Sequence, residues 1–126
     1  ILSELIPSVQ EKMNNYDKWM VTGASLGATH AANLILRFPK QFDTLLALSG
    51  IYDTELFYGD YHDENTYHNN PCAYMKNMSL DHPYIELYKQ SKLIFFKISY
   101  YFLFFNCENF YKYLTFFVLF AQRLRQ

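Results

Sequence analysis

The chain has 126 residues, 51% of them hydrophobic, which suits one small domain with a packed core. Its formal net charge of −1 excludes a general electrostatic attraction to nucleic acid or to an anionic membrane surface. No uncharged apolar run reaches the ~18 residues of a membrane-spanning helix, so neither a nucleic-acid partner nor a membrane is expected.

The first predicted element is a helix over residues 2–14, because its apolar residues recur at steps of three and four and so share one face. These residues are Leu2, Leu5, Ile6, Val9 and Met13. Pro7 is tolerated only in the first turn, so the helix is expected to begin close to Ser3. A turn over residues 14–17 then leads into a buried strand over residues 18–22.

The strand runs into Gly23-Ala24-Ser25-Leu26-Gly27, a Gly-x-Ser-x-Gly pentapeptide that a helix over residues 26–38 follows at once. Strand, pentapeptide and helix in this order are the context of a nucleophile elbow, whose serine lies on a strained turn. Side chains at positions 23 and 27 would collide with the strand and the helix, so both positions are predicted to need glycine. The Leu26 N–H can then point at an oxyanion. The alternative is a glycine-rich packing corner without chemistry.

The helix over residues 26–38 is expected to be buried on most sides, and Pro39 ends it. Residues 43–49 predict a second buried strand. Because strand, helix and strand are joined by short links, we expect a right-handed crossover and a parallel pair. His30, one turn into the helix, is interpreted as a packing histidine.

Residues 52–91 are polar, aromatic and rich in turns, with short helices predicted at 54–58, 71–76 and 82–90. This segment either forms the wall of a substrate pocket or is a solvated excursion. Its acidic residues and histidines resemble a metal cluster only superficially and are interpreted as a solvated acidic loop. They are Asp60, His62, Asp63, Glu64 and His68. A third strand is predicted over residues 92–98.

Residues 99–126 form a low-complexity tail. Between positions 95 and 120 lie 13 of the chain's 25 aromatic residues, and the tail contains no Gly or Pro to form a sharp turn. Its apolar residues come in blocks rather than at a clean period. We therefore predict that the tail is not a native continuation of the sheet.

Two cysteines, Cys72 and Cys107, are too few for a disulfide framework or a zinc site. Two free thiols in a reducing compartment are expected, and with them a cytoplasmic location. The chain opens in mid-pattern and without Met, so its true N-terminus is expected to be missing.

Several motifs in order carry a family resemblance. They are T-G-A-S-L-G-A-T-H-A-A-N (residues 22–33), R-F-P-K-Q-F-D (37–43), A-L-S-G-I-Y-D (47–53), F-Y-G-D-Y (57–61) and Y-K-Q-S-K-L-I-F (88–95). Over about residues 4–96 the chain resembles the putative-esterase branch of the α/β-hydrolases, the group with esterase D, S-formylglutathione hydrolase-like enzymes and feruloyl esterases. The resemblance implies an α/β fold with a mostly parallel sheet, a nucleophile elbow and flanking helices.

The resemblance also implies a carboxylic-ester hydrolase that acts on a small-molecule ester or thioester without a metal or an organic cofactor. Ser25 corresponds to the nucleophile and Leu26 to the backbone oxyanion donor. The acid and the histidine that the family places after the third strand are missing, because the only later acid is Glu108 and no histidine follows His82. Weak substitutes are Asp53 as the acid, with His82 as the base.

His62 and His68 are further candidates for that base. We therefore expect residues 1–98 to be a partial α/β-hydrolase domain, the central fragment of an esterase and inactive by itself. Residues 99–126 are expected to be foreign to the fold. Two other classes stay open: a non-catalytic interaction module on the same scaffold, and a membrane-associated protein held by the aromatic tail.

Overall fold

Three parallel strands form the sheet, in the order β1-β2-β3. They are β1 (Trp19–Ala24), β2 (Phe42–Leu48) and β3 (Lys92–Phe96). This computed structural model describes residues 1–12 and 18–96, so the predicted tail and Glu108 lie outside the described residues. The three predicted strands and their parallel pairing are confirmed, and so is the α/β class.

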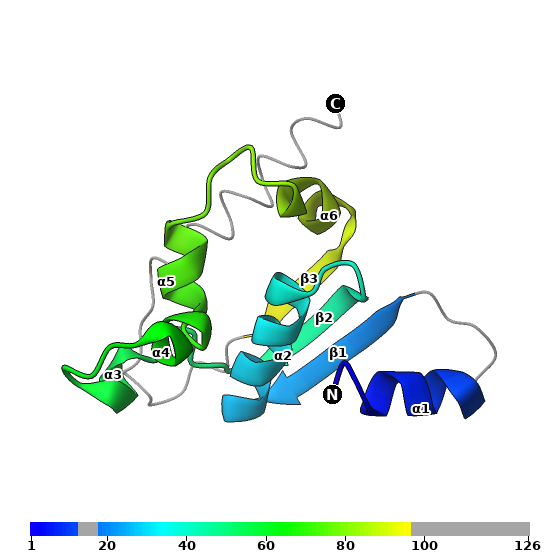
Figure 1. Ribbon diagram of the computed structural model, residues 1–126, viewed down its shortest axis with the longest axis horizontal. Helices are drawn as coiled ribbons and strands as arrows, with labels where there is room; N and C mark the ends of the chain where they lie inside the picture. Colours follow the sequence, from blue (N-terminus) through cyan, green and yellow to red (C-terminus); the bar gives the residue numbers. More distant parts are fainter. Residues whose placement is uncertain (13–17, 97–126) are drawn as a thin grey trace.

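Six helices accompany the sheet in the described part of the chain (Figure 1). They are α1 (Leu5–Lys12), α2 (Leu26–Arg37), α3 (Glu55–Tyr58), α4 (Glu64–His68), α5 (Pro71–Lys76) and α6 (Tyr84–Gln90). Helix α1 begins at Leu5 rather than close to Ser3. Helix α4 was not predicted. It forms because the Asp63 carboxylate accepts the Thr66 N–H at 2.7 Å while the Thr66 hydroxyl accepts the Asp63 N–H at 2.9 Å, a reciprocal cap.

The core lies between α2 and the sheet. Ala28, Ala31 and Ala32 are at most 2% exposed, and these small side chains let the helix backbone approach the strands closely. Ile35 and Leu36 extend the same contact to the last turns of α2, where both are almost fully buried. The expected burial of this helix is confirmed, since seven of its twelve residues are buried.

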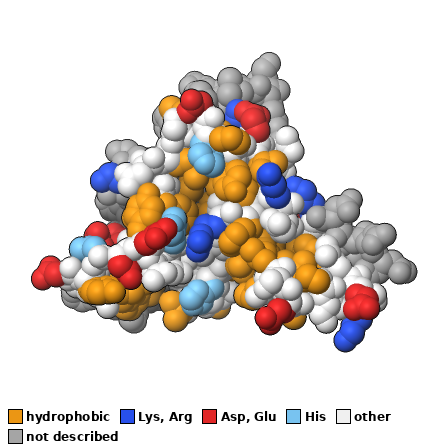
Figure 2. All heavy atoms as spheres, viewed as in Figure 1, with side chains coloured by type: hydrophobic (Ala, Val, Ile, Leu, Met, Phe, Trp, Pro, Cys, Tyr) orange, Lys and Arg blue, Asp and Glu red, His pale blue; other side chains and the backbone are white. Residues whose placement is uncertain are grey.

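The strands alternate between the two faces of the sheet. Val21 and Phe95 pack against the core, whereas Met20, Ile94 and Phe96 point to the other face and are 57%, 37% and 61% exposed. On the side of the molecule where α2 lies, hydrophobic patches are interrupted by charged side chains and histidines (Figure 2). No helix in the described part of the chain has the length and apolarity needed to cross a membrane.

Buried hydrogen bonds tie the segment between β2 and β3 to α2. The Tyr74 hydroxyl on α5 donates to the Asn33 side-chain carbonyl at 2.8 Å, and the Tyr88 hydroxyl on α6 donates to the Leu36 carbonyl. Burial raises the pKa of Tyr74 and of Tyr88 well above the usual range of a phenol. Both hydroxyls therefore keep their protons and stay donors at any physiological pH.

Cys72, on α5, is disulfide-bonded. The expectation of a free thiol at this position is therefore wrong. Composition alone gave only the number of cysteines, and the pairing of a thiol depends on which segments the fold brings together. Cys107 lies outside the described residues.

The bond between Tyr74 and Asn33 provides a test of the packing of α5 on α2. Tyr74→Phe should lower the free energy of unfolding by about 1–3 kcal/mol, because it leaves a buried amide oxygen without a donor. Urea denaturation measures the loss. The matched control is Tyr61→Phe, because Tyr61 is 64% exposed and should change stability by less than about 0.5 kcal/mol. Equal losses in the two variants would show that α5 does not pack as described.

Candidate active site

Ser25 is the single residue between β1, which ends at Ala24, and α2, which begins at Leu26. Its backbone has φ 53° and ψ −124°, and its side chain is exposed. A positive φ is uncommon for a residue other than glycine, and such a conformation costs on the order of 1–3 kcal/mol. We call residues 23–27 the Ser25 turn.

The backbone of Ser25 is bonded to both neighbouring elements. Its N–H donates to the Leu48 carbonyl at 2.8 Å and so continues the ladder between β1 and β2. Its carbonyl accepts the N–H groups of Ala28 and Thr29, at 3.0 and 3.3 Å, which are the first bonds of α2. The N–H groups of Leu26 and Gly27 consequently have no acceptor within the helix, and they lie at its positive end.

The two glycines of the turn differ in what they permit. A Cβ on Gly23 would lie 2.2 Å from the Gly27 carbonyl oxygen and 2.3 Å from its carbon, so only glycine fits at position 23. A Cβ on Gly27 would have no neighbour within 4 Å among the described residues. The prediction for position 23 is confirmed and that for position 27 is wrong, because only the backbone of Gly27 makes the close contact.

This asymmetry can be tested by introducing the same methyl group at each position. Gly23→Ala should cost about 3 kcal/mol or more of the free energy of unfolding, since backbone atoms cannot move aside as a side chain can. Gly27→Ala should stabilise the protein by about 0.5–1 kcal/mol, because alanine is the better helix former. Chemical denaturation of both variants measures the difference. A tolerated alanine at position 23 would contradict the described turn.

All four histidines of the chain lie in its described residues. His30 is exposed on α2, so its interpretation as a packing histidine is wrong. The burial of its neighbours Ala31 and Ala32 shows which face of the helix meets the sheet. His62 is exposed between α3 and α4.

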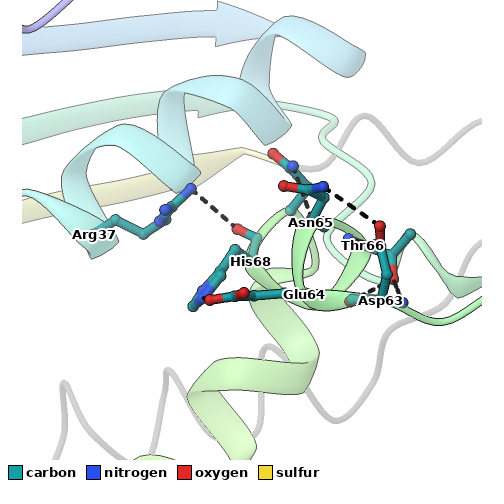
Figure 3. Close-up of polar contacts among 7 residues, drawn as sticks. Arg37, Asp63, Glu64, Asn65, Thr66 and His68 are labelled. Carbon is teal, nitrogen blue, oxygen red and sulfur yellow. Dashed lines mark hydrogen bonds and ion pairs between the residues drawn. The ribbon is translucent and has the colours of Figure 1, made fainter.

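His68 lies on α4, where its imidazole is 3.6 Å from the Glu64 carboxylate (Figure 3). Its backbone carbonyl accepts a hydrogen bond of 3.5 Å from Arg37, in the last turn of α2. The imidazole of His68 thus faces Glu64, and none of its bonds in the described residues leads to Ser25.

His82 precedes α6, and its Nδ1 accepts the Tyr84 N–H at 3.1 Å. Figure 1 shows α6 near the end of α2 that is remote from the Ser25 turn, in agreement with the bond from Tyr88 to Leu36. Within the described residues, no imidazole is hydrogen-bonded to the Ser25 hydroxyl.

Asp53 follows β2 and holds together the segment after it. Its carboxylate accepts the Glu55 N–H and the Asn70 side-chain amide, both at 3.2 Å, and so links the start of α3 to the start of α5. The structure brings Asp53 together with Asn70, not with a histidine.

The acidic loop before α4 has a structural role. Asp63 caps the helix, and the Thr66 N–H bonded to its carboxylate lowers the pKa of that group (Figure 3). In the part of the chain that the structure describes, no group of three or more His, Cys, Asp or Glu residues could hold a metal ion.

The predicted second strand ends at Ser49, whereas the observed β2 ends at Leu48 and Ser49 has φ 51°. Ser25 and Ser49 are the two residues other than glycine with a positive φ in the described segments. The signal in the sequence was the Ser-Gly pair that directly follows a buried strand, a pattern typical of a tight exit turn.

The family model described as Putative esterase matches residues 1–91 of the chain. The match therefore includes every described element except β3. Neither a curated protein nor a solved structure matches the chain.

Proposed function

The chain belongs to the Putative esterase family, and on that premise we propose that it carries the nucleophile of a carboxylic-ester hydrolase site. Ser25 is the nucleophile, and the Leu26 backbone N–H donates to the oxyanion. The small parallel sheet with its flanking helices is compatible with part of an α/β-hydrolase fold, and the substrate is a small-molecule ester.

The observation that carries the proposal is the backbone conformation of Ser25. Ser25 is exposed and lies between a strand and a helix in a strained conformation. Such a conformation costs free energy and persists only when the surrounding structure holds it, and strain of this kind concentrates at functional sites. In the proposed reaction, the Ser25 hydroxyl oxygen attacks the acyl carbonyl carbon while its proton passes to a solvent water molecule, and the departing alcohol oxygen later takes up a proton from solvent. The resulting oxyanion accepts the Leu26 N–H. Collapse of this intermediate releases the alcohol, and water then hydrolyses the acyl-enzyme.

The proposed mechanism also predicts that the esterase activity of the chain by itself is low. Removal of the proton from serine needs a base, and no histidine in the described residues is bonded to the Ser25 hydroxyl. Asp53 is already bonded to Asn70. We therefore propose that the chain by itself is an inefficient esterase. The end of the family match at residue 91 supports placing residues 99–126 outside the esterase domain.

Ser25 should be the serine that a fluorophosphonate modifies first. The reagent reacts with nucleophilic serines, and at Ser25 the leaving fluoride needs less help than an alcohol would. Peptide mapping by mass spectrometry after a long incubation should locate the adduct at Ser25, and Ser25→Ala should remove it. Ser79→Ala, at another exposed serine, is the matched control and should leave labelling unchanged. An adduct spread over several serines, or one that survives in Ser25→Ala, would contradict the proposal that Ser25 is the nucleophile.

The unmodified chain should hydrolyse p-nitrophenyl acetate no faster than its Ser25→Ala variant. Loss of the histidine or the serine of a triad costs roughly 10⁶ in turnover, and the activity that survives comes from the oxyanion hole and binding. Release of p-nitrophenolate measures both rates. An advantage above about a hundredfold for the unmodified chain would require a base near Ser25. Single replacements of His62, His68 and His82 would then identify it.

A further inference from the structure

Cys72 is firmly held at the start of α5. Its N–H donates to the Tyr52 carbonyl at 3.1 Å, so the exit loop of β2 fixes its backbone. Asn70 caps the same helix, because its side-chain carbonyl accepts the Ala73 N–H at 3.2 Å while its amide donates to the Asp53 carboxylate at 3.2 Å. The Cys72 side chain is partly buried and packs against the hydrophobic core. A disulfide at this position therefore joins its partner segment to a fixed point of the fold.

The sequence leaves one partner for Cys72 within the chain. Cys72 is disulfide-bonded, and it is the single cysteine among the described residues. The chain has two cysteines, and the other is Cys107, 35 residues further along. A disulfide within one chain can therefore join Cys72 only to Cys107.

The fold places Cys72 within reach of the segment that contains Cys107. The Ser49 N–H donates to the carbonyl of Phe96, the last residue of β3, at 2.7 Å, and Ser49 is three residues before Tyr52, whose carbonyl is bonded to Cys72. Even if those three residues were fully extended, this path would place the α-carbons of Phe96 and Cys72 less than about 25 Å apart. Cys107 is the eleventh residue after Phe96, and a segment of that length spans up to about 36 Å. The segment is therefore long enough to bring Cys107 to α5.

The covalent connection also favours Cys107 over a cysteine of a second copy. Two groups joined by a short stretch of chain have an effective concentration in the millimolar range. A second copy at about 1 µM offers its cysteines at roughly a thousandth of that concentration. Pairing within the chain consequently prevails in dilute solution.

We infer that Cys107 is the disulfide partner of Cys72, and that the bond joins the segment after β3 to the start of α5. The bond forms when the two thiols pass two electrons and two protons to a small-molecule disulfide such as oxidised glutathione, which leaves as two thiols. The inference does not depend on the proposed function, because neither cysteine takes part in the ester chemistry. It joins the tail covalently to the domain that the family match defines, although the tail lies beyond that match.

The test maps the disulfide in the full chain after incubation with a mixture of oxidised and reduced glutathione. Trypsin cleaves after Lys and Arg, so Cys72 falls in the peptide 41–76 and Cys107 in the peptide 98–112. Mass spectrometry without reductant should find these two peptides joined, and the intact protein should be a monomer that gains two hydrogen atoms on reduction. A link between two copies of one peptide, a disulfide-bonded dimer, a glutathione adduct or two free thiols would each overturn the inference.

Cys107→Ala tests whether the bond holds the segment to α5, and it leaves α5 itself unchanged. A bond that closes a loop of this length restricts the unfolded chain, so its loss should raise the equilibrium constant for unfolding in urea about 10²–10³-fold. Dithiothreitol should destabilise the unmodified chain to the same degree. The matched control is Cys107→Ala itself, whose stability dithiothreitol should not change. A Cys107→Ala variant as stable as the oxidised chain would overturn the inference.

Discussion

The contact between the backbones of Gly23 and Gly27 is the constraint on which the rest of the structure depends. Because Gly23 has no Cβ, the first turn of α2 can lie directly over the end of β1. The chain then reverses through one residue, and Ser25 takes up the positive φ that this reversal requires. A side chain at position 23 would push the helix from the sheet and remove both the strained serine and the core beneath it.

Helix α2 also positions the segments that follow β2. Its alanines lie on the sheet, and three of its other residues bond the segments that follow β2: Thr29 holds Ile51, Asn33 holds Tyr74, and Leu36 holds Tyr88. These bonds occur at successive turns of the helix, so α2 fixes the exit loop of β2, then α5, then α6. The carboxyl edge of the sheet is thus built around the same helix that begins at Ser25.

The candidate site separates two requirements of serine chemistry. A strained serine beside unpaired helix N–H groups needs only local geometry, which one strand, one turn and one helix provide. A catalytic base, in contrast, must come from a second segment of the chain that packs next to the serine. The packing of α6 instead holds His82 near the far end of α2, and the imidazole of His68 faces Glu64. The described residues accordingly position the proposed nucleophile, Ser25, and bond no histidine to its hydroxyl.

The sequence by itself determined the features that depend on neighbours in the chain. Short apolar runs located the three strands, and an apolar stretch ended by Pro39 located α2. The Gly-x-Ser-x-Gly pattern located the turn and the requirement for glycine at position 23. Only the tertiary structure decided the features that depend on distant neighbours. Contacts with β3 and α2 hold Ser49 in its strained conformation, the packing of α2 leaves His30 exposed, and open space beside Gly27 makes a side chain tolerable there. Local patterns report backbone preference, whereas exposure and strain are set by the segments that the fold brings together.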